Sequence, residues 1–204
     1  MDKSKQASLV YDKIAESYAN EFSKPSEHID EFLVLIPKSG RILDVGCGVG
    51  VDSGYMVSKG FEIIGVDLSK EMLRLAKQRF PQIEFKLADI RKLDFPLNSF
   101  NGILASCSLI HIPKKDFPQT LKNFYRMLKK EGVIYIALQG GNSEEIIIDE
   151  PFKPDEKLFL NILSFDEIKN LLEGTGFSIV KKYEREPKSK EELNFKKVFI
   201  IAKK

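Results

Sequence analysis

Two short stretches carry residue types that could bind a nucleoside. The run at 43–50 alternates glycines with other residues and holds an acid, Asp44. Glycines permit a tight turn and let a ligand approach the backbone closely. A second carboxylate, Asp67, follows the apolar run 62–66, and a carboxylate at that distance can accept hydrogen bonds from both ribose hydroxyls. We expect these two stretches to converge on one nucleoside.

The elements that must position these groups alternate along the chain. Short apolar runs predict strands, and the longer segments between them have helical spacing with recognisable start and stop residues. Ser69 is the expected N-cap of the helix 69–79, Ser26 can cap a helix at 26–35, and Gly174 and Gly176 are expected to end the helix 165–173. Strands that alternate with helices of ten or more residues predict βαβ units and a mainly parallel sheet. The expected strands are 41–45, 62–66, 84–87, 102–106 and 132–138, and the expected helices are 51–59, 69–79, 114–129 and 165–173.

The remaining segments extend this core at both ends. Helices are expected at 8–22 and 26–35, and two strand-like runs, 178–183 and 197–202, are expected to form a hairpin around the polar stretch 184–194. We therefore predict an α/β fold: a Rossmann-like, seven-stranded, mostly parallel sheet with one antiparallel strand and helices on both faces.

One domain is expected over residues 1–204, with an N-terminal helical cap at 1–40. The segment 140–163 interrupts the alternation and is rich in acids and phenylalanine. A long insertion in a compact domain is often a binding loop, so we predict a lid there. It should lie on the ligand side of the sheet, because ligands bind beyond the carboxyl ends of parallel strands.

Composition excludes several classes of function. A net charge of +2 is too small to predict binding to nucleic acid or to an anionic membrane. Cys47 and Cys107 show neither the spacing of a zinc site nor a disulfide framework, so we expect no metal and reduced thiols in the cytoplasm. The N-terminus lacks the apolar region of a signal peptide, and no apolar run could span a bilayer. Oligomeric state cannot be read from these features.

The glycine run, read with its surroundings, resembles the first motif of the class I S-adenosylmethionine (SAM)-dependent methyltransferases. Its form is G-x-G-x-G with an acid two residues before it, whereas dinucleotide-binding loops usually read G-x-G-x-x-G. The stretches 65–69, 88–90, 100–112 and 128–134 also fit this family, and 11–18 is similar to the N-terminal helix of its small-molecule branch. The resemblance implies SAM as cofactor and a small-molecule methyl acceptor.

SAM and a dinucleotide differ in charge, and this difference explains why their binding loops differ in sequence. A dinucleotide places a pyrophosphate at the helix N-terminus, and Asp44 would repel it. SAM presents a zwitterionic methionine and a sulfonium, and an acid suits its ammonium group or the ordering of the loop.

The resemblance also assigns roles to individual residues. The loop residues contact the methionine part, Asp67 holds the ribose, and Leu68 packs on the adenine. Asp89 accepts from the adenine amino group beside the Ile90 amide, although capping a turn is an equally good interpretation of Asp89 alone. The implied cofactor-binding residues are Asp44, Gly46, Cys47, Gly48, Gly50, Asp67, Leu68, Asp89, Ile90, Ala105, Ser106, Tyr18 and Tyr11.

Methyl transfer from a sulfonium needs alignment and a dry site more than it needs a fixed catalytic group. A general base is required only if the acceptor arrives protonated. His111 is the candidate for that base, because it follows the fourth strand and imidazole titrates near neutrality. The alternative is a histidine that packs or caps the next helix, and Cys107 is expected to pack.

Aromatic and acidic residues suggest an acceptor pocket. Tyr11 and Tyr18 lie on one helical stripe, which is also the pattern of an ordinary core. Phe152 and Phe159 are candidates to line the pocket. The acids of the insertion are expected to be solvated, although a cationic acceptor would suit them; these are Glu144, Glu145, Asp149 and Glu150.

Two other functions, and one variant of the methyltransferase function, remain open at this point. An NAD(P)-dependent oxidoreductase is disfavoured by the form of the loop and by the lack of a recognisable hydride-transfer partner. A SAM-binding regulator without turnover shares the same binding motifs and is not distinguished by them. A nucleic-acid methyltransferase is disfavoured by the mild charge and the absence of an N-P-P-Y or D-P-P-Y motif.

Overall fold

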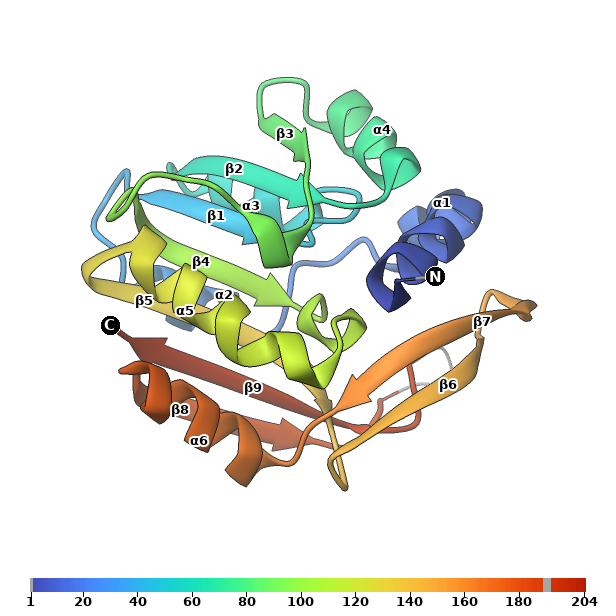
Figure 1. Ribbon diagram of the computed structural model, residues 1–204. Coiled ribbons are helices and arrows are strands. Elements are labelled where there is room, and N and C mark those ends of the chain that lie inside the picture. Colours follow the sequence, from blue (N-terminus) through green and yellow to red (C-terminus); the bar gives the residue numbers. More distant parts are fainter. Residues whose placement is uncertain (1, 189–191) are drawn as a thin grey trace.

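The protein is described here by a computed structural model that covers residues 2–188 and 192–204. The strands of its main sheet are β1 (Arg41–Val45), β2 (Glu62–Asp67), β3 (Glu84–Leu87), β4 (Phe100–Ser106), β5 (Leu128–Gly140), β8 (Ser178–Arg185) and β9 (Lys196–Lys203). These form one seven-stranded sheet in the order β3-β2-β1-β4-β5-β9-β8 (Figure 1). Strands β1 to β5 are parallel, and β9 runs antiparallel to both of its neighbours. The predicted Rossmann-like fold with one antiparallel strand is confirmed.

The sheet is covered on both faces, because its central strands are apolar on both sides. In β5, Ile134 and Ile136 belong to one buried cluster, whereas Val133 and Tyr135 belong to the other. Side chains alternate between the faces of a strand, so a doubly covered strand reads as a continuous apolar run. The run at 132–138 is therefore central to the sheet.

In the described part of the chain, six α-helices pack around this sheet: α1 (Lys3–Glu21), α2 (Ile29–Leu33), α3 (Val51–Ser58), α4 (Lys70–Arg79), α5 (Phe117–Met127) and α6 (Phe165–Thr175). Short 3₁₀ turns are η1 (Ile90–Lys92), η2 (Leu109–His111) and η3 (Lys114–Asp116). Helices α5 and α6 cover one face, and α2, α3 and α4 cover the other. Helix α1 lies beyond the ends of the strands, against α4 and the segment that follows β5 (Figure 1).

Local signals explain several helix ends. Asp2 accepts from the amides of Ser4 and Lys5, so α1 begins five residues before the expected start at residue 8. The Ser69 hydroxyl accepts from the Met72 amide and caps α4, as predicted from the sequence. Gly176, at φ +108°, ends α6 in the left-handed conformation that favours glycine.

The second helix is shorter than the sequence predicts. The expected range was 26–35 with Ser26 as its cap, but α2 begins at Ile29 after His28, which has φ +61°. Ser26 bonds instead to Asp52: its amide lies 2.7 Å from Oδ1 and its hydroxyl 2.6 Å from Oδ2. The half-buried Asp52 carboxylate therefore holds the Ser26 side chain, which does not cap the helix.

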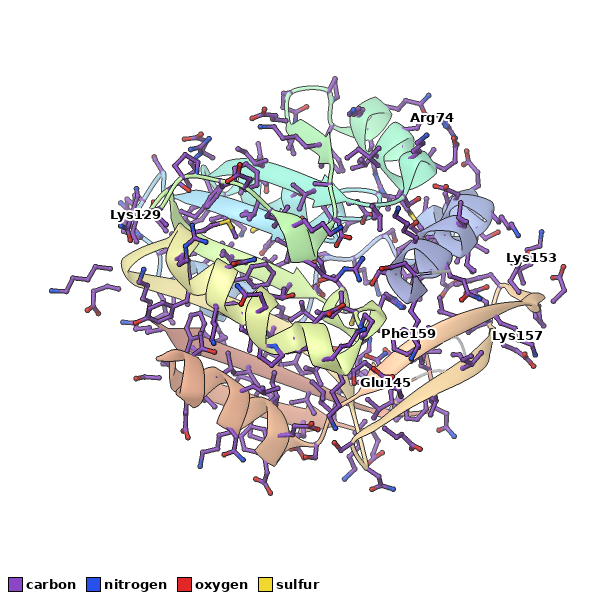
Figure 2. The ribbon with its side chains drawn as sticks, viewed as in Figure 1. Arg74, Lys129, Glu145, Lys153, Lys157 and Phe159 are labelled. Carbon is purple, nitrogen blue, oxygen red and sulfur yellow. The ribbon has the colours of Figure 1, made fainter. Side chains whose placement is uncertain are left out.

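The expected insertion 140–163 is a β-hairpin rather than an irregular loop. It consists of β6 (Glu144–Glu150) and β7 (Lys153–Ile162), paired antiparallel. Alternate residues Leu158, Leu160 and Ile162 are buried in the same cluster as α5 and α6. Figure 2 shows Lys153 and Lys157 toward the outer end of this hairpin and Phe159 nearer the sheet. In β6, the partly buried Ile146 and Ile148 flank the exposed Ile147, a strand period that the acidic composition obscured.

The C-terminal hairpin is formed by β8 and β9, as predicted. Part of its polar connection, 189–191 within 184–194, lies outside the described residues. Within the described residues, no helix combines the length and the apolar character needed to cross a membrane.

Candidate functional site

Hydrogen bonds to the neighbouring strand β2 fix the conformation of the turn after β1. The amides of Gly46 and Cys47 both donate to the Val66 carbonyl, at 2.7 and 3.0 Å. Gly46 has φ +71°, and a Cβ built on it would lie 2.3 Å from the Cβ of Ser108. Both the backbone conformation and the close approach to Ser108 therefore require glycine at this position.

Asp67 joins the ends of β1 and β2. Its Oδ2 accepts from the Gly48 amide at 2.9 Å, and its Oδ1 accepts from the Ser69 amide at 2.8 Å. Burial raises the pKa of Asp67, and the hydrogen bonds from Ser69 and Gly48 act in the opposite direction. A carboxylate offers about four lone-pair sites, so acceptor capacity remains for a ligand hydroxyl.

Two cavities meet at this turn. The smaller, about 100 Å³, lies over the ends of β2 and β3, and the larger, about 250 Å³, lies over β1, β4 and β5. They share one set of lining residues: Tyr11, Tyr18, Gly46, Gly48, Ser106 and Cys107. An elongated ligand that crosses the glycine turn would therefore occupy both.

The smaller cavity has apolar walls and polar ends. Leu68, Met72 and Ile90 line it together with Asp67 and Asp89. These walls suit a flat heteroaromatic ring, and Asp67 supplies hydrogen-bond acceptors at its edge.

Asp89 is already engaged by a cation. It caps η1 by accepting from the Arg91 amide, and the Arg91 guanidinium donates to both carboxylate oxygens. Burial raises the pKa of Asp89, but the hydrogen bonds and charge of Arg91 outweigh burial and lower it overall. Arg91 also donates to Asp2, so it ties the start of α1 to the rim of this cavity. The expected contact between Asp89 and adenine stays a prediction.

Two acids line the larger cavity beside the glycine turn, the buried Asp44 and the half-buried Asp52. Asp44 is 2 % exposed and accepts from the Ser53 hydroxyl at 2.6 Å. Burial raises the pKa of Asp44 well above its ordinary value, and the nearby Asp52 adds to the shift. Burial also raises the pKa of Asp52. Among the described residues no cation pairs with either carboxylate, so this end of the cavity suits a positively charged ligand group.

His111, which lines the smaller cavity, forms a hydrogen-bonded pair with Tyr11, which lines both cavities. His111 Nδ1 lies 3.1 Å from the Phe159 carbonyl oxygen, and Nε2 lies 2.9 Å from the Tyr11 hydroxyl. A carbonyl can only accept, so Nδ1 carries the proton and Nε2 accepts from Tyr11. Burial lowers the pKa of His111 to about 4, which keeps the imidazole neutral at pH 7. The role of His111 as a base stays a prediction.

The far wall of the larger cavity is aromatic. Phe22 and Phe152 meet edge to face with ring centroids 5.9 Å apart, and Tyr18 packs on Phe22 at 4.6 Å. Phe159 is not part of this wall, contrary to expectation; its ring packs near Lys3 while its carbonyl holds His111. Strand alternation turns Phe159 to the other side of β7.

One of the four hairpin acids that were expected to be solvated is buried. Glu144, Glu145 and Asp149 are exposed, but Glu150 is 3 % exposed and lines the larger cavity. The expectation of solvation was therefore wrong for Glu150. It lies at the end of β6, where the turn carries its side chain inward.

Most of the expected cofactor residues line one cavity or the other, but two do not. Gly50 lies at the start of α3, where a Cβ would meet Phe85 at 2.9 Å, so packing accounts for this glycine. Ala105 is fully buried inside β4. Both lie next to residues that do reach a cavity, and the sequence could not separate them from those neighbours.

Several lining residues were not identified from the sequence: Phe22, Ser26, Asp52, Gln139, Leu158, Leu193 and Lys197. Asp52 had a usable signal, since it lies in the first turn of the helix after the glycines. The others come from segments distant in the sequence and share no motif. Across residues 2–188 and 192–204, no group of three His, Cys, Asp or Glu side chains is placed to hold a metal ion.

Comparison with known proteins gives consistent matches. Residues 42–132 match the family model described as a methyltransferase domain. The chain is 36 % identical over 128 residues to the candidate methyltransferase YqeM of Bacillus subtilis (strain 168), which covers 60 % of this chain and 52 % of YqeM. It is 30 % identical over 171 residues to an uncharacterized methyltransferase of Alkaliphilus oremlandii (strain OhILAs), covering 80 % and 74 % of the two chains. The chain thus spans about half the length of YqeM.

A solved structure shares the whole fold. The Burkholderia thailandensis 1,6-didemethyltoxoflavin-N1-methyltransferase superposes with a TM-score of 0.69 and 18 % identity, covering 100 % of this chain and 91 % of that chain. At this level of identity the match extends to the fold alone.

Proposed function

The chain belongs to the class I SAM-dependent methyltransferase family, and on that premise we propose that it transfers the methyl group of SAM to a small-molecule acceptor held in the larger cavity. The observation that most supports this proposal is the junction of the two cavities at the glycine turn. The apolar walls of the smaller cavity suit an adenine. The larger cavity is proposed to take the methionine moiety and the acceptor.

The residues present fit this cofactor. Asp67 retains acceptor capacity after binding two backbone amides, and Asp44 is a buried acid without a cation among the described residues. A ribose and an ammonium group would satisfy them. We propose Gly46, Gly48, Asp44, Asp67 and Leu68 as cofactor-binding residues.

The protein's part in the reaction is alignment and exclusion of water. When bound, SAM supplies an electrophilic methyl group on its sulfonium. Tyr18 and Ser106 border both cavities, so they would flank the place where the methyl group meets its acceptor. Alignment of this kind can contribute roughly 7–11 kcal/mol to lowering a barrier. Helix α1 and the β6–β7 hairpin are proposed to cover the reacting groups.

His111 is proposed to act mainly by holding other groups in place. Its two nitrogens link the Tyr11 hydroxyl of α1 to the Phe159 carbonyl of the hairpin. It thereby connects the two segments of the proposed cover. A base role would require Nε2 to be released from Tyr11.

A methyl-transfer assay tests the proposal. The protein is incubated with methyl-labelled SAM and either the dialysable metabolites or the retained macromolecules of a cell extract. We expect label in the dialysable fraction. Label in the retained fraction would reject a small-molecule acceptor, and SAM binding without any transfer would favour a regulator. Tight binding of NADH in place of S-adenosylhomocysteine (SAH) would favour an oxidoreductase.

A further inference from the structure

The acids that line the larger cavity are not equivalent. Glu27 and Glu192 are both paired with Arg185, at 2.6 and 2.7 Å. Asp44 and Asp52 lie beside the glycine turn, at the end assigned above to the SAM ammonium group. Glu150 remains, and no cation pairs with it among the described residues.

Only one of the two carboxylate oxygens of Glu150 accepts hydrogen bonds from the described residues. Its Oε2 accepts from the amides of Phe152 and Lys153, at 2.7 and 2.8 Å. Its Oε1 has no hydrogen-bond partner in the described part of the chain. A carboxylate that is 3 % exposed is costly to keep without a countercharge. The free oxygen therefore suits a cationic or hydrogen-bond-donating ligand.

Gln139 gives an independent sign of a ligand in the same cavity. It lies near the end of β5, is 4 % exposed and lines the larger cavity. Among the described residues, its only side-chain hydrogen bond is a long one, which the Cys107 thiol donates to Oε1 at 4.0 Å. Buried amides normally satisfy their hydrogen bonds, so this side chain is built to meet a polar group of the ligand.

The rest of the wall is apolar. Phe22, Phe152 and Leu158 line the cavity, and Tyr18 packs against Phe22. Aromatic faces attract cations as well as apolar groups. Lys24, also on the lining, is an exposed residue, and Lys197 lies 3.5 Å from Glu192. Charge and apolar surface thus combine for a small organic cation.

We propose that the methyl acceptor is a small amine with an apolar body, bound through its nitrogen by Glu150 and Gln139. This inference rests on the proposed function. The amine arrives as an ammonium and loses one proton, which passes to water. Its nitrogen lone pair then bonds to the methyl carbon of SAM, and the electron pair of the carbon–sulfur bond stays on sulfur. The products are a methylammonium and neutral SAH, and charge balances with the released proton.

Calorimetry with three probes of similar size tests this inference: phenethylamine, 2-phenylethanol and 3-phenylpropionate, each titrated into the SAH-saturated protein. We expect phenethylamine to bind about tenfold or more tightly than the alcohol, as a charge-assisted hydrogen bond provides. Glu150→Gln should remove this preference. Glutamine keeps an oxygen for the Phe152 and Lys153 amides, so the turn should fold, which thermal unfolding checks.

Asp149→Asn is the matched control. Asp149 precedes Glu150 on β6, is 60 % exposed at its side chain and pairs with Lys157, so this variant makes the same charge change outside the cavity. We expect it to keep the amine preference, with SAH affinity within about twofold in all proteins.

The outcomes separate the two proposals. Absence of SAH binding to the wild-type protein overturns the proposed function. SAH binding with equal affinity for the three probes, including no binding of any, overturns the amine inference alone. So does preference for 3-phenylpropionate, which would indicate an anionic acceptor, or an amine preference that survives Glu150→Gln.

Discussion

The two ends of the site are built in different ways. At the end over β2 and β3, backbone amides hold the polar side chains: Gly48 and Ser69 donate to Asp67, and Arg91 donates through its amide to Asp89. At the end over β4 and β5, side chains from distant segments meet, such as Phe22 from the N-terminal region and Phe152 from the hairpin. The first end is fixed by strand geometry, and the second depends on how the insertions pack.

This difference has a functional consequence. An end fixed by the backbone of adjacent strands can keep one cofactor, because few substitutions alter its shape. An end lined by side chains of a hairpin and a terminal segment can change its ligand without disturbing the sheet. The comparison predicts that substitutions at the two ends have separable effects on SAH binding and on acceptor binding.

The largest effect is expected for Gly46→Ala. A Cβ there would lie 2.3 Å from the Ser108 Cβ, at a backbone φ of +71°. Strain and overpacking together should weaken SAH binding by about a hundredfold or more. Calorimetry measures the affinity, and thermal unfolding checks that the variant folds. Gly174→Ala, where nothing lies within 4 Å of the added carbon, is the control and should bind normally. Normal SAH binding by Gly46→Ala would contradict a close fit at this turn.

The next effect concerns the free energy of unfolding and its dependence on the protonation of His111, whose hydrogen-bond partner Tyr11 lines both ends of the site. His111 has a pKa of about 4 in the folded protein, because of burial, against an ordinary value of about 6.5. As pH falls through 6.5 the unfolded chain takes up a proton and the folded chain does not, so stability decreases until about pH 4. The loss should be about 3 kcal/mol.

Chemical unfolding between pH 7.5 and 4 measures this loss in wild-type protein and in His111→Gln. The variant should lack this part of the pH dependence, so the two curves should converge at low pH. His28→Gln serves as the control for the other histidine. Parallel curves for wild type and His111→Gln would show that His111 is not held neutral.

Asp67→Ala should weaken SAH binding about tenfold or more, because a charge-assisted hydrogen bond is worth about 1.5–3 kcal/mol. The loss of its bonds to the Gly48 and Ser69 amides adds to the effect. Asp94→Ala, at an exposed acid, is the charge-matched control. An unchanged SAH affinity in Asp67→Ala would show that Asp67 does not bind the ribose.

The smallest effect is expected at the acceptor end. Phe152→Ala removes the edge-to-face contact with Phe22 and part of the apolar wall. An aromatic pair contributes about 0.5–1.5 kcal/mol, so KM for the acceptor should rise roughly three- to tenfold while SAH affinity stays the same. Ile147→Ala, at a hairpin side chain that is 65 % exposed, is the control. A parallel loss of SAH affinity in Phe152→Ala would mean that the two ends are not separable.

Much of the molecule was predictable because its signals are local. The parallel strands, the capped helix α4 and the C-terminal hairpin follow from apolar periodicity and from residues such as Ser69 and Gly176. The glycine run and Asp67 were also recognisable, since their spacing is that of two neighbouring strand ends. The predictions failed where a residue distant in the sequence bound a predicted cap. Ser26 bonds to Asp52, and α2 begins at Ile29 instead of at the predicted cap.

The sequence by itself therefore determined the sheet, its helices and the cofactor motif, because each depends on contacts between residues close along the chain or on adjacent strands. Only the tertiary structure decided which acids are buried. Glu150 and Asp149 are neighbours of similar chemistry, yet the turn after β6 places one in the cavity and leaves the other in solvent. It also decided that Tyr11 and Phe159 occupy both nitrogens of His111. Burial and hydrogen-bond partners are set by packing between distant segments, which residue spacing does not encode.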